Sequence, residues 1–337
     1  MYSIIVPVFN RPDEVDELLR SLTAQTFRDF EVVVVEDGST TPCQEVCERY
    51  AERLDLRYFS KPNSGPGQSR NYGAERARGA YLIILDSDVV LPAGYLAAVD
   101  DGVRRTEAEA FGGPDKAHPS FSPTQKAISH SMTSFFTTGG IRGGKAKLDK
   151  FYPRSFNMGV RADVYRALGG FSRMRFGEDI DFSYRIVEAG YRPRLFAEAW
   201  VWHKRRTDFR KFWRQVYNSG IARINLEKRH PGTLKIVHLL PMVFTLGVAF
   251  MALLAVVLLA FGPWWGALLA ISPVALYSLL VFADSALRYR SPRIGFLSVG
   301  AAFVQLTGYG CGFLEAWWKR VVKGQGEFQA YAKNFYK

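Results

Sequence analysis

The chain has 337 residues, 48% of them hydrophobic, and it carries a formal net charge of +12 at pH 7. Residues 204–233 hold more than half of this charge, with nine Lys or Arg against two Asp or Glu among apolar and aromatic residues. Such a basic, aromatic stretch is typical of a membrane surface and argues against a nucleic-acid partner, although a nucleic-acid patch is the alternative. By number and spacing, Cys43, Cys47 and Cys311 form neither a disulfide framework nor a zinc set.

The N-terminal half alternates short apolar runs with stretches of helical spacing, which predicts strands and helices in turn. The expected elements are a strand and turn over residues 3–10, a helix over 12–24, strands over 30–35 and 56–59, a helix over 67–77 and a strand over 80–85. Because such alternation implies right-handed crossovers, it predicts an α/β fold with a parallel sheet. Ligands of such sheets gather outside the carboxyl ends of the strands.

Carboxylates stand where two of these expected strands give way to loops. Asp37 follows the second strand in Glu36-Asp37-Gly38-Ser39, and the fourth strand runs into Asp86-Ser87-Asp88. Hard divalent cations prefer oxygen ligands, so an Asp-x-Asp pair at a strand end suits a cation that carries phosphate. The alternative is a solvated turn, since Asp-Gly in particular is a common loop pair.

Five motifs follow one another in order over about the first 205 residues. They are Ile5-Val6-Pro7-Val8-Phe9-Asn10, Glu36-Asp37-Gly38-Ser39, Gly67 with Arg70-Asn71, Asp86-Ser87-Asp88, and Gly177-Glu178-Asp179. In this order they make the chain resemble the family 2 glycosyltransferases, which are inverting enzymes with the GT-A fold that use nucleotide-sugar donors. The resemblance implies a GT-A domain, with a Rossmann-like and mostly parallel sheet, over residues 1–205.

The resemblance also implies roles for individual residues. Asp37 would accept hydrogen bonds from the nucleotide base, Asp86 would contact the ribose or the metal, and Asp88 would coordinate Mn²⁺ or Mg²⁺ on the donor diphosphate. Asp179 would be the catalytic base, because inversion needs one base to take the proton from the acceptor hydroxyl. The residues assigned to the donor nucleotide are Pro7, Asp37, Arg70, Asp86, Asp88, Arg205 and Arg206.

His203 follows Trp200-Val201-Trp202 at the expected end of a late strand and precedes Lys204-Arg205-Arg206. Some GT-A enzymes supply a histidine from this region as a further metal ligand, and neutral imidazole suits Mn²⁺. The basic residues after it are expected either to neutralise the diphosphate or to face a membrane surface. Plainer alternatives exist: a packed ring for His203, a helix N-terminal carboxylate for Asp179, a solvated charge for Arg70, and a helix start for Asn157 instead of a place beside the donor sugar.

The C-terminal third changes from polar to apolar composition. Residues 239–283 contain no charged side chain and are interrupted by Gly262-Pro263-Trp264-Trp265, which predicts two membrane spans with an interfacial turn. Residues 294–314 form a third uncharged run. A buried helical hairpin of a soluble protein is the alternative. The expected domains are GT-A over 1–205, amphipathic interface helices over 206–233, transmembrane helices over 234–318 and a basic tail over 319–337.

The orientation expected in the cytoplasmic membrane follows from the donor. A nucleotide sugar made in the cytosol requires a cytoplasmic catalytic domain, and the positive-inside rule agrees for the loop that holds Arg288, Arg290 and Arg293. Three full crossings would place the basic tail outside. The alternative is that the third segment, with its four glycines at 300, 308, 310 and 312, packs closely without a simple crossing. Residues 139–151 are expected to form a loop that closes over donor or acceptor.

One departure from the family pattern concerns processivity. Processive polysaccharide synthases carry Gln-x-x-Arg-Trp near the first membrane helix, and Gln215-Val216-Tyr217-Asn218-Ser219 does not match it. The sequence therefore favours transfer of single sugars to a lipid-linked or glycan acceptor. Two rival functions remain open: a haloacid-dehalogenase-like phosphatase with Asp86 as nucleophile, and a membrane-anchored sugar-nucleotide binder without turnover.

Overall fold

The computed structural model describes residues 1–118, 120–138, 151–328 and 330. The chain divides into two compact units, and the first consists of Met1–His118 and Leu148–Lys204. The second unit consists of Pro119–Lys147 and Arg205–Phe335. Most of the loop expected over residues 139–151, and the end of the basic tail, lie outside the described residues.

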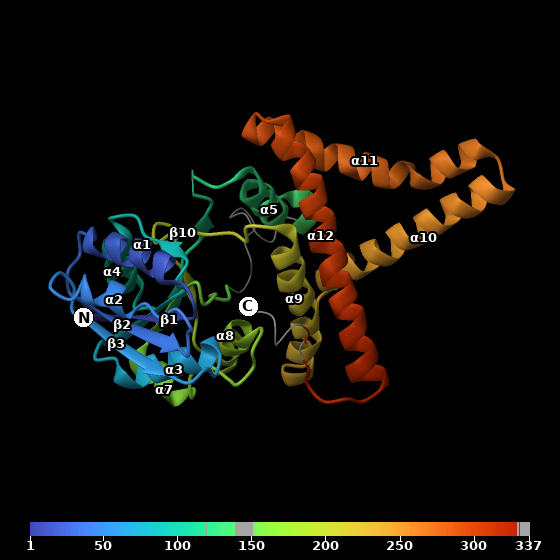
Figure 1. Ribbon diagram of the computed structural model, residues 1–337. Helices are drawn as coiled ribbons and strands as arrows, with labels where there is room; N and C mark the ends of the chain where they lie inside the picture. The colour runs from blue at the N-terminus through green and yellow to red at the C-terminus, as the bar shows by residue number, and fades with distance from the viewer. Residues whose placement is uncertain (119, 139–150, 329, 331–337) are drawn as a thin grey trace. The chain divides into compact units, whose positions relative to one another are not determined.

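The first unit is an α/β domain (Figure 1). Its strands are β1 (Tyr2–Val8), β2 (Phe30–Asp37), β3 (Leu56–Lys61), β4 (Tyr81–Leu85), β5 (Val89–Val90), β6 (Ala110–Gly112), β7 (Asp115–Lys116), β8 (Asn157–Arg161), β9 (Arg194–Leu195) and β10 (Val201–His203). Its helices are α1 (Pro12–Thr23), α2 (Gln44–Glu48), α3 (Pro66–Arg76), α4 (Tyr95–Thr106), α7 (Ala162–Ala167) and α8 (Glu178–Glu188). The strands and helices expected over the first 85 residues are therefore confirmed, with shifts of one or two residues at their ends.

Seven strands form the main sheet in the order β3-β2-β1-β4-β8-β6-β9. The first four of these are parallel, and β8 runs antiparallel to both β4 and β6. A second, small sheet has the order β5-β10-β7. The expectation of a mostly parallel, Rossmann-like sheet is confirmed, and the carboxyl ends of β1, β2 and β4 lie at one edge.

Alternating residues of the parallel strands build two apolar layers, as the two-residue period of a strand requires. Ile4 and Val6 of β1 belong to a core cluster with residues of α1, α2 and α4. Ile5 belongs to a second cluster with residues of α7 and α8. Figure 1 shows the same division, with α1, α2 and α4 on one face of the sheet and α3 and α7 on the other. Because both faces are covered, these strands read as continuous apolar runs.

The second unit is helical in the part that the structure describes. Its helices are α5 (Pro123–Thr133), α6 (Phe135–Thr138), α9 (Phe209–Arg229), α10 (Leu240–Phe261), α11 (Trp264–Tyr289) and α12 (Pro292–Trp317), with a 3-10 turn at Ile236–His238 and a π-helical turn at Trp318–Val322. Three segments are long and apolar enough to cross a membrane: Leu240–Phe261, Trp264–Tyr289 and Pro292–Val322. They correspond to the three runs that the sequence singled out.

A single boundary at residue 205 does not separate the two units completely, because α5, which lies before that residue in the sequence, belongs to the second unit. Ala127 and Ile128 of α5 pack with Phe212 and Val216 of α9 and with Ala301 of α12. Apolar spacing in α5 gave no indication of this partner, since a helix of eleven residues buries its apolar side equally well on a sheet or on other helices.

Helices α9 and α12 pack at close range through glycines. A Cβ atom on Gly220 would lie 2.2 Å from the carbonyl oxygen of Tyr309, and one on Gly312 would lie 2.1 Å from that of Tyr217. Small residues at such contacts let two helix backbones approach closely. Apolar residues of α9, within the region expected to form membrane-interface helices (206–233), thus pack against α12. The way in which the third segment crosses a membrane stays a prediction.

Candidate functional site

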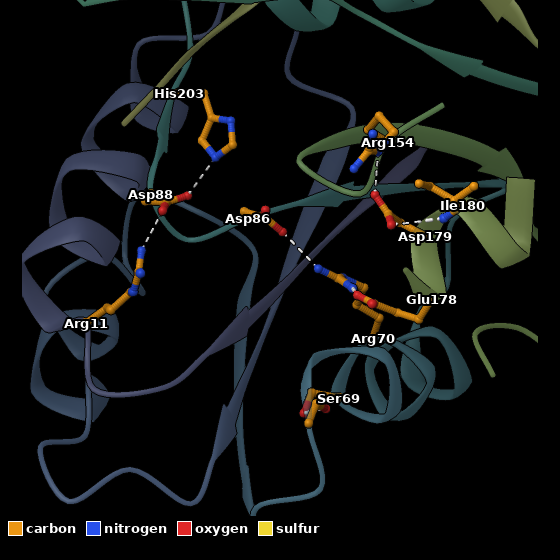
Figure 2. A network of polar contacts seen from close by, with 11 residues as sticks. Arg11, Ser69, Arg70, Asp86, Asp88, Arg154, Glu178, Asp179, Ile180 and His203 are labelled. Atoms are coloured by element: carbon orange, nitrogen blue, oxygen red, sulfur yellow. Dashed lines mark hydrogen bonds and ion pairs between the residues drawn. The ribbon is translucent and has the colours of Figure 1, made fainter. Parts of the chain in front are cut away.

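Strand register brings three possible metal ligands together in the first unit. Asp86 and Asp88 follow β4 directly, and the short strand β5 comes next. Antiparallel pairing of β5 with β10 sets His203 opposite Val89, which is the neighbour of Asp88. One ligand atom each of Asp86, Asp88 and His203 lies within 4.8 Å of the other two (Figure 2). Two carboxylates and an imidazole at this spacing fit a divalent cation such as Mn²⁺ or Mg²⁺.

The ring of His203 is held in place on two sides. Its Nε2 lies 3.3 Å from Oδ1 of Asp88, and its Nδ1 lies 3.9 Å from Oδ2 of Asp115. The ring stacks on Phe156 with 4.9 Å between ring centroids. The packed-ring interpretation and the ligand interpretation are therefore compatible, because packing fixes the plane in which Nε2 points toward Asp88.

Arg11 is a site residue that the sequence analysis missed. Its Nη1 lies 2.5 Å from Oδ2 of Asp88, which is the oxygen that His203 does not face. The preceding Asn10 has φ of 54°, a left-handed conformation that asparagine tolerates, and its Oδ1 accepts hydrogen bonds from the backbone N–H groups of Thr40 and Thr41. This turn fixes the start of α1 and directs Arg11 toward the end of β4. The available signal was its position directly after the first motif.

Arg70 of α3 links the Asp-x-Asp loop to α8. Its Nη2 donates to Oδ1 of Asp86 at 2.9 Å, and its Nη1 donates to Oε1 of Glu178 at 2.7 Å. The guanidinium also lies over the ring of Phe171, with its carbon 5.1 Å from the ring centroid. Arg70 is buried, so the interpretation as a solvated helix charge is wrong. Its predicted proximity to the nucleotide stays a prediction.

Asp179 lies in the first turn of α8, where the helix follows Gly177 with φ of 82°. Its Oδ2 accepts a hydrogen bond from Nε of Arg154 at 2.7 Å, and its Oδ1 accepts one from the backbone N–H of Ile180 at 2.9 Å. Burial raises the pKa of Asp179, but the Arg154 and Arg70 guanidinium groups and the backbone N–H of Ile180 together lower it by more, so the net pKa lies below the ordinary value of a carboxyl. Asp179 is therefore ionised, which is the form that a base requires.

The neighbouring Glu178 has the opposite behaviour. Burial raises the pKa of Glu178 above its ordinary value, and the ion pair with Arg70 offsets this only in part. The two adjacent carboxyls repel each other when both are ionised, so one keeps its charge at the expense of the other. Divergent pKa values in adjacent carboxyls are a common sign of a functional site. Sequence reasoning quoted Glu178 as part of a motif but gave it no role.

Asp37 ends β2 and is buried. Its Oδ1 accepts hydrogen bonds from Nζ of Lys61 and from the backbone N–H of Ser64, and its Oδ2 accepts one from the backbone N–H of Gly65. A carboxylate has about four lone-pair sites, so these three bonds leave room for one further donor on Oδ2. The predicted contact with a nucleotide base would use that remaining place.

The other residues assigned from sequence have separate surroundings. Pro7 lies near the end of β1 opposite Val35 of β2, beyond the part of β1 that pairs with β4. Asn157 is the first residue of β8 and does not start a helix; its Oδ1 accepts from Tyr95 Oη, and its Nδ2 donates to the Ala199 carbonyl. Arg205 and Arg206 belong to the second unit, and their diphosphate contacts stay predictions.

Comparison with known proteins identifies the domain that carries this site. Residues 3–167 match the family model described as glycosyl transferase family 2. Over these residues the chain belongs to the family 2 glycosyltransferases. As a family 2 glycosyltransferase, it has Asp37, Arg70, Asp86 and Asp88 inside the matched region, whereas Asp179 and His203 follow it.

Relatives of this glycosyltransferase are matched over parts of their length. It is 40% identical over 86 residues to an uncharacterized glycosyltransferase of Rickettsia felis, which covers 26% of this chain and 14% of that protein. It is 27% identical over 256 residues to the pre-mycofactocin glycosyltransferase of Mycobacterium tuberculosis, covering 68% of this chain and 48% of that protein. The chain thus spans less than half the length of these curated relatives.

A solved structure supports the fold of the glycosyltransferase. A mannosyltransferase from Pyrobaculum calidifontis, in complex with GDP-Man and Mn²⁺, superposes with a TM-score of 0.58 at 17% sequence identity, over 95% of this chain and 87% of that one. At this identity the likeness concerns the GT-A fold alone. With the family match, it leaves the phosphatase alternative without support.

Proposed function

We propose that this chain is a membrane-bound, inverting glycosyltransferase that moves one sugar per turnover from a nucleotide-sugar donor to a lipid-linked or glycan acceptor. The observation that carries the proposal is the pairing of two chemically different groups in one domain. One is the Asp86, Asp88 and His203 cluster, and the other is the ionised, buried Asp179. The first suits a cation that carries a diphosphate, and the second suits a base.

The proposed reaction breaks one bond to the sugar and forms another on the opposite face. The acceptor hydroxyl gives its proton to Oδ2 or Oδ1 of Asp179, and its oxygen forms a bond to the anomeric carbon. The bond from that carbon to the diphosphate breaks, and its electron pair leaves with the diphosphate. A bound Mn²⁺ or Mg²⁺ would stabilise the charge that grows on this leaving group.

The residues of the chain perform binding and positioning in this scheme. Asp86, Asp88 and His203 would hold the cation, and Asp37 would accept a hydrogen bond from the base through its remaining lone pair. Arg70 keeps Asp86 and Glu178 at a fixed separation through its two Nη atoms. Arg205 and Arg206, which come directly after Lys204, would add positive charge for the diphosphate.

The helices of the second unit supply the membrane part of the proposal. Three of them have the length and composition of membrane spans, and this supports an acceptor in or near the lipid. The absence of the Gln-x-x-Arg-Trp motif at 215–219 argues for transfer of single sugars. We assign the catalytic domain to the cytoplasmic side of the cytoplasmic membrane, because nucleotide sugars are cytosolic.

The decisive experiment is a nucleotide-release assay on the full-length protein in detergent or nanodiscs. UDP-sugars and GDP-sugars are supplied separately, with Mn²⁺, Mg²⁺ or a chelator, and free UDP or GDP is measured. We expect cation-dependent release with at least one donor. Asp179→Asn should bind the same nucleotide with near wild-type affinity. It should form free UDP or GDP from the donor about 10²–10⁴-fold more slowly, since an amide of the same shape does not accept the proton.

Two results would count against this function. Binding of a nucleotide sugar without release, by the wild-type protein over the whole donor panel and with membrane lipids present, would support the binder alternative. Wild-type turnover in Asp179→Asn would remove the base assignment and leave the metal cluster as the remaining part of the proposal.

A further inference from the structure

The contact between Arg11 and Asp88 has a consequence for how the cation and the donor bind. Resting on the proposed function, we propose that Arg11 is the counter-cation of Asp88 in the free enzyme and that it moves to the donor diphosphate when a divalent cation binds. Arg11 would then make the cation and the donor bind with positive coupling. It is a positioning and binding residue in this scheme and takes no part in proton transfer.

The position of Arg11 is the first argument. It contacts Oδ2 of Asp88 at 2.5 Å, while Oδ1 of the same carboxylate faces His203 at 3.3 Å. Both oxygens of Asp88 therefore have a basic neighbour, and Figure 2 shows the carboxylate between them. The Arg11 guanidinium and a divalent cation both bind the carboxylate oxygens of Asp88. A cation that binds Asp88 therefore weakens or replaces the contact between Asp88 and Arg11.

The freedom of Arg11 to move is the second argument. One third of its side chain is exposed, whereas that of Arg70 is 3% exposed. Arg70 is also held by two carboxylates, Asp86 and Glu178, and by the ring of Phe171. Of these two arginines beside the Asp-x-Asp loop, Arg11 is the one that can turn toward a ligand in solvent without breaking a buried network.

The balance of charge is the third argument. Three guanidinium groups, from Arg11, Arg70 and Arg154, are paired with carboxyls of Asp86, Asp88, Glu178 and Asp179. A divalent cation entering alone adds two positive charges to carboxylates that already have cationic partners. A cation entering with a diphosphate adds no net charge and offers Arg11 a new pair of oxygens, which an arginine binds well.

The test measures Mn²⁺ binding without turnover, on the full-length protein. Free Mn²⁺ is followed by electron paramagnetic resonance, first alone and then with saturating UDP or GDP. We expect weak binding of Mn²⁺ alone to the wild type and clear tightening by one of the nucleotides. Arg11→Gln should bind Mn²⁺ alone about tenfold more tightly, because a cation next to the site is removed, and the tightening by nucleotide should shrink.

Three variants make the result specific. Arg20→Gln removes an exposed positive charge from the same helix, α1, and should bind Mn²⁺ as the wild type does. Arg11→Lys keeps the charge on a shorter head group and should lie between the wild type and Arg11→Gln. Asp88→Ala should lose the measured Mn²⁺, which shows that the signal comes from this site. Thermal melting of each variant shows that it is folded.

The outcomes separate this inference from the proposed function. If Mn²⁺ binds the wild type and is lost in Asp88→Ala, but Arg11→Gln has wild-type affinity and coupling, Arg11 is only a structural partner of Asp88 and this inference fails alone. If neither Mn²⁺ nor a nucleotide binds the folded wild type, the metal assignment fails, and the Arg11 inference fails with it.

Discussion

The end of β4 and the contact between α9 and α12 solve opposite packing problems. At the end of β4, charged side chains that are buried or partly buried pair with groups of opposite sign, as the buried Arg70 does with Asp86 and Glu178. At the closest points of the α9–α12 contact, Gly220 and Gly312 carry no side chain, and this lets the two backbones touch. In the first region, function and packing depend on which charged side chain occupies a position. In the second, they depend on the position having no side chain.

The largest expected effect comes from removing a ligand at the end of β4. Asp88→Ala takes away a carboxylate that both Arg11 and His203 contact, and we expect turnover to fall by about 10³-fold or more with loss of cation-dependent nucleotide binding. Stability should change little in comparison, because Asp88 lies in the short loop between β4 and β5 and is not part of the apolar layers. The measurements are nucleotide release and UDP or GDP titration with Mn²⁺. Unchanged Mn²⁺-dependent affinity would remove Asp88 from the metal site.

The next effect should be on stability and not on chemistry. Gly312→Ala places a Cβ about 2 Å from the Tyr217 carbonyl oxygen, and such overpacking typically costs about 1–3 kcal/mol in the free energy of unfolding. Gly247→Ala in α10 is the matched control, because the nearest atom to its Cβ is 4.0 Å away and alanine is the better helix former. Melting in detergent should separate the two variants, while Mn²⁺ binding by folded Gly312→Ala should be normal. Equal melting temperatures would argue against the close contact.

The smallest effect is a shift in pH dependence. The charged groups around Asp179 are Arg154, Arg70 and Glu178, and Arg154 lowers the pKa of Asp179 the most. In Arg154→Gln the pKa of Asp179 should rise, so the base is protonated at a higher pH and the acid limb of kcat/KM moves upward. Activity well above that limb should be less affected, since Asp179 is ionised there in both proteins.

A matched control exists for this pH profile. Arg161→Gln removes a guanidinium that is partly exposed and pairs with Asp163, away from Asp179. Its acid limb should coincide with that of the wild type. An unmoved limb in Arg154→Gln would mean that a group other than Asp179 titrates in that range.

Sequence reasoning reached the strand ends because the signal there is local. An apolar run followed by Asp86-Ser87-Asp88 predicts within a few residues that a buried strand ends in a polar loop. The uncharged runs over 239–283 and 294–314 predict equally directly helices that are long enough to span a bilayer. The parallel sheet followed from the alternation of strands and helices. These features depend on spacing, which a single sequence displays.

The missed features depend on contacts between distant residues. Arg11 and Asp88 are 77 positions apart, and Arg70 and Glu178 are 108 positions apart, so no period in the chain connects them. The approach of His203 to Asp88 was expected only from the family resemblance, because it depends on the register of two very short strands, β5 and β10. The membership of α5 in the second unit likewise depends on which partner covers its apolar side.

Arg70 connects the loop that carries the proposed metal ligands to the helix that carries the proposed base. Its planar guanidinium spans from the loop after β4 to the first turn of α8, and a lysine would not reproduce this two-sided grip. Attempts to change the donor or the acceptor by building chimeras should therefore exchange α3, the Asp86-Ser87-Asp88 loop and α8 together. In a chimera that takes only one of these segments from another enzyme, we expect the residues that hold the diphosphate and the residue that accepts the proton to be wrongly positioned relative to each other.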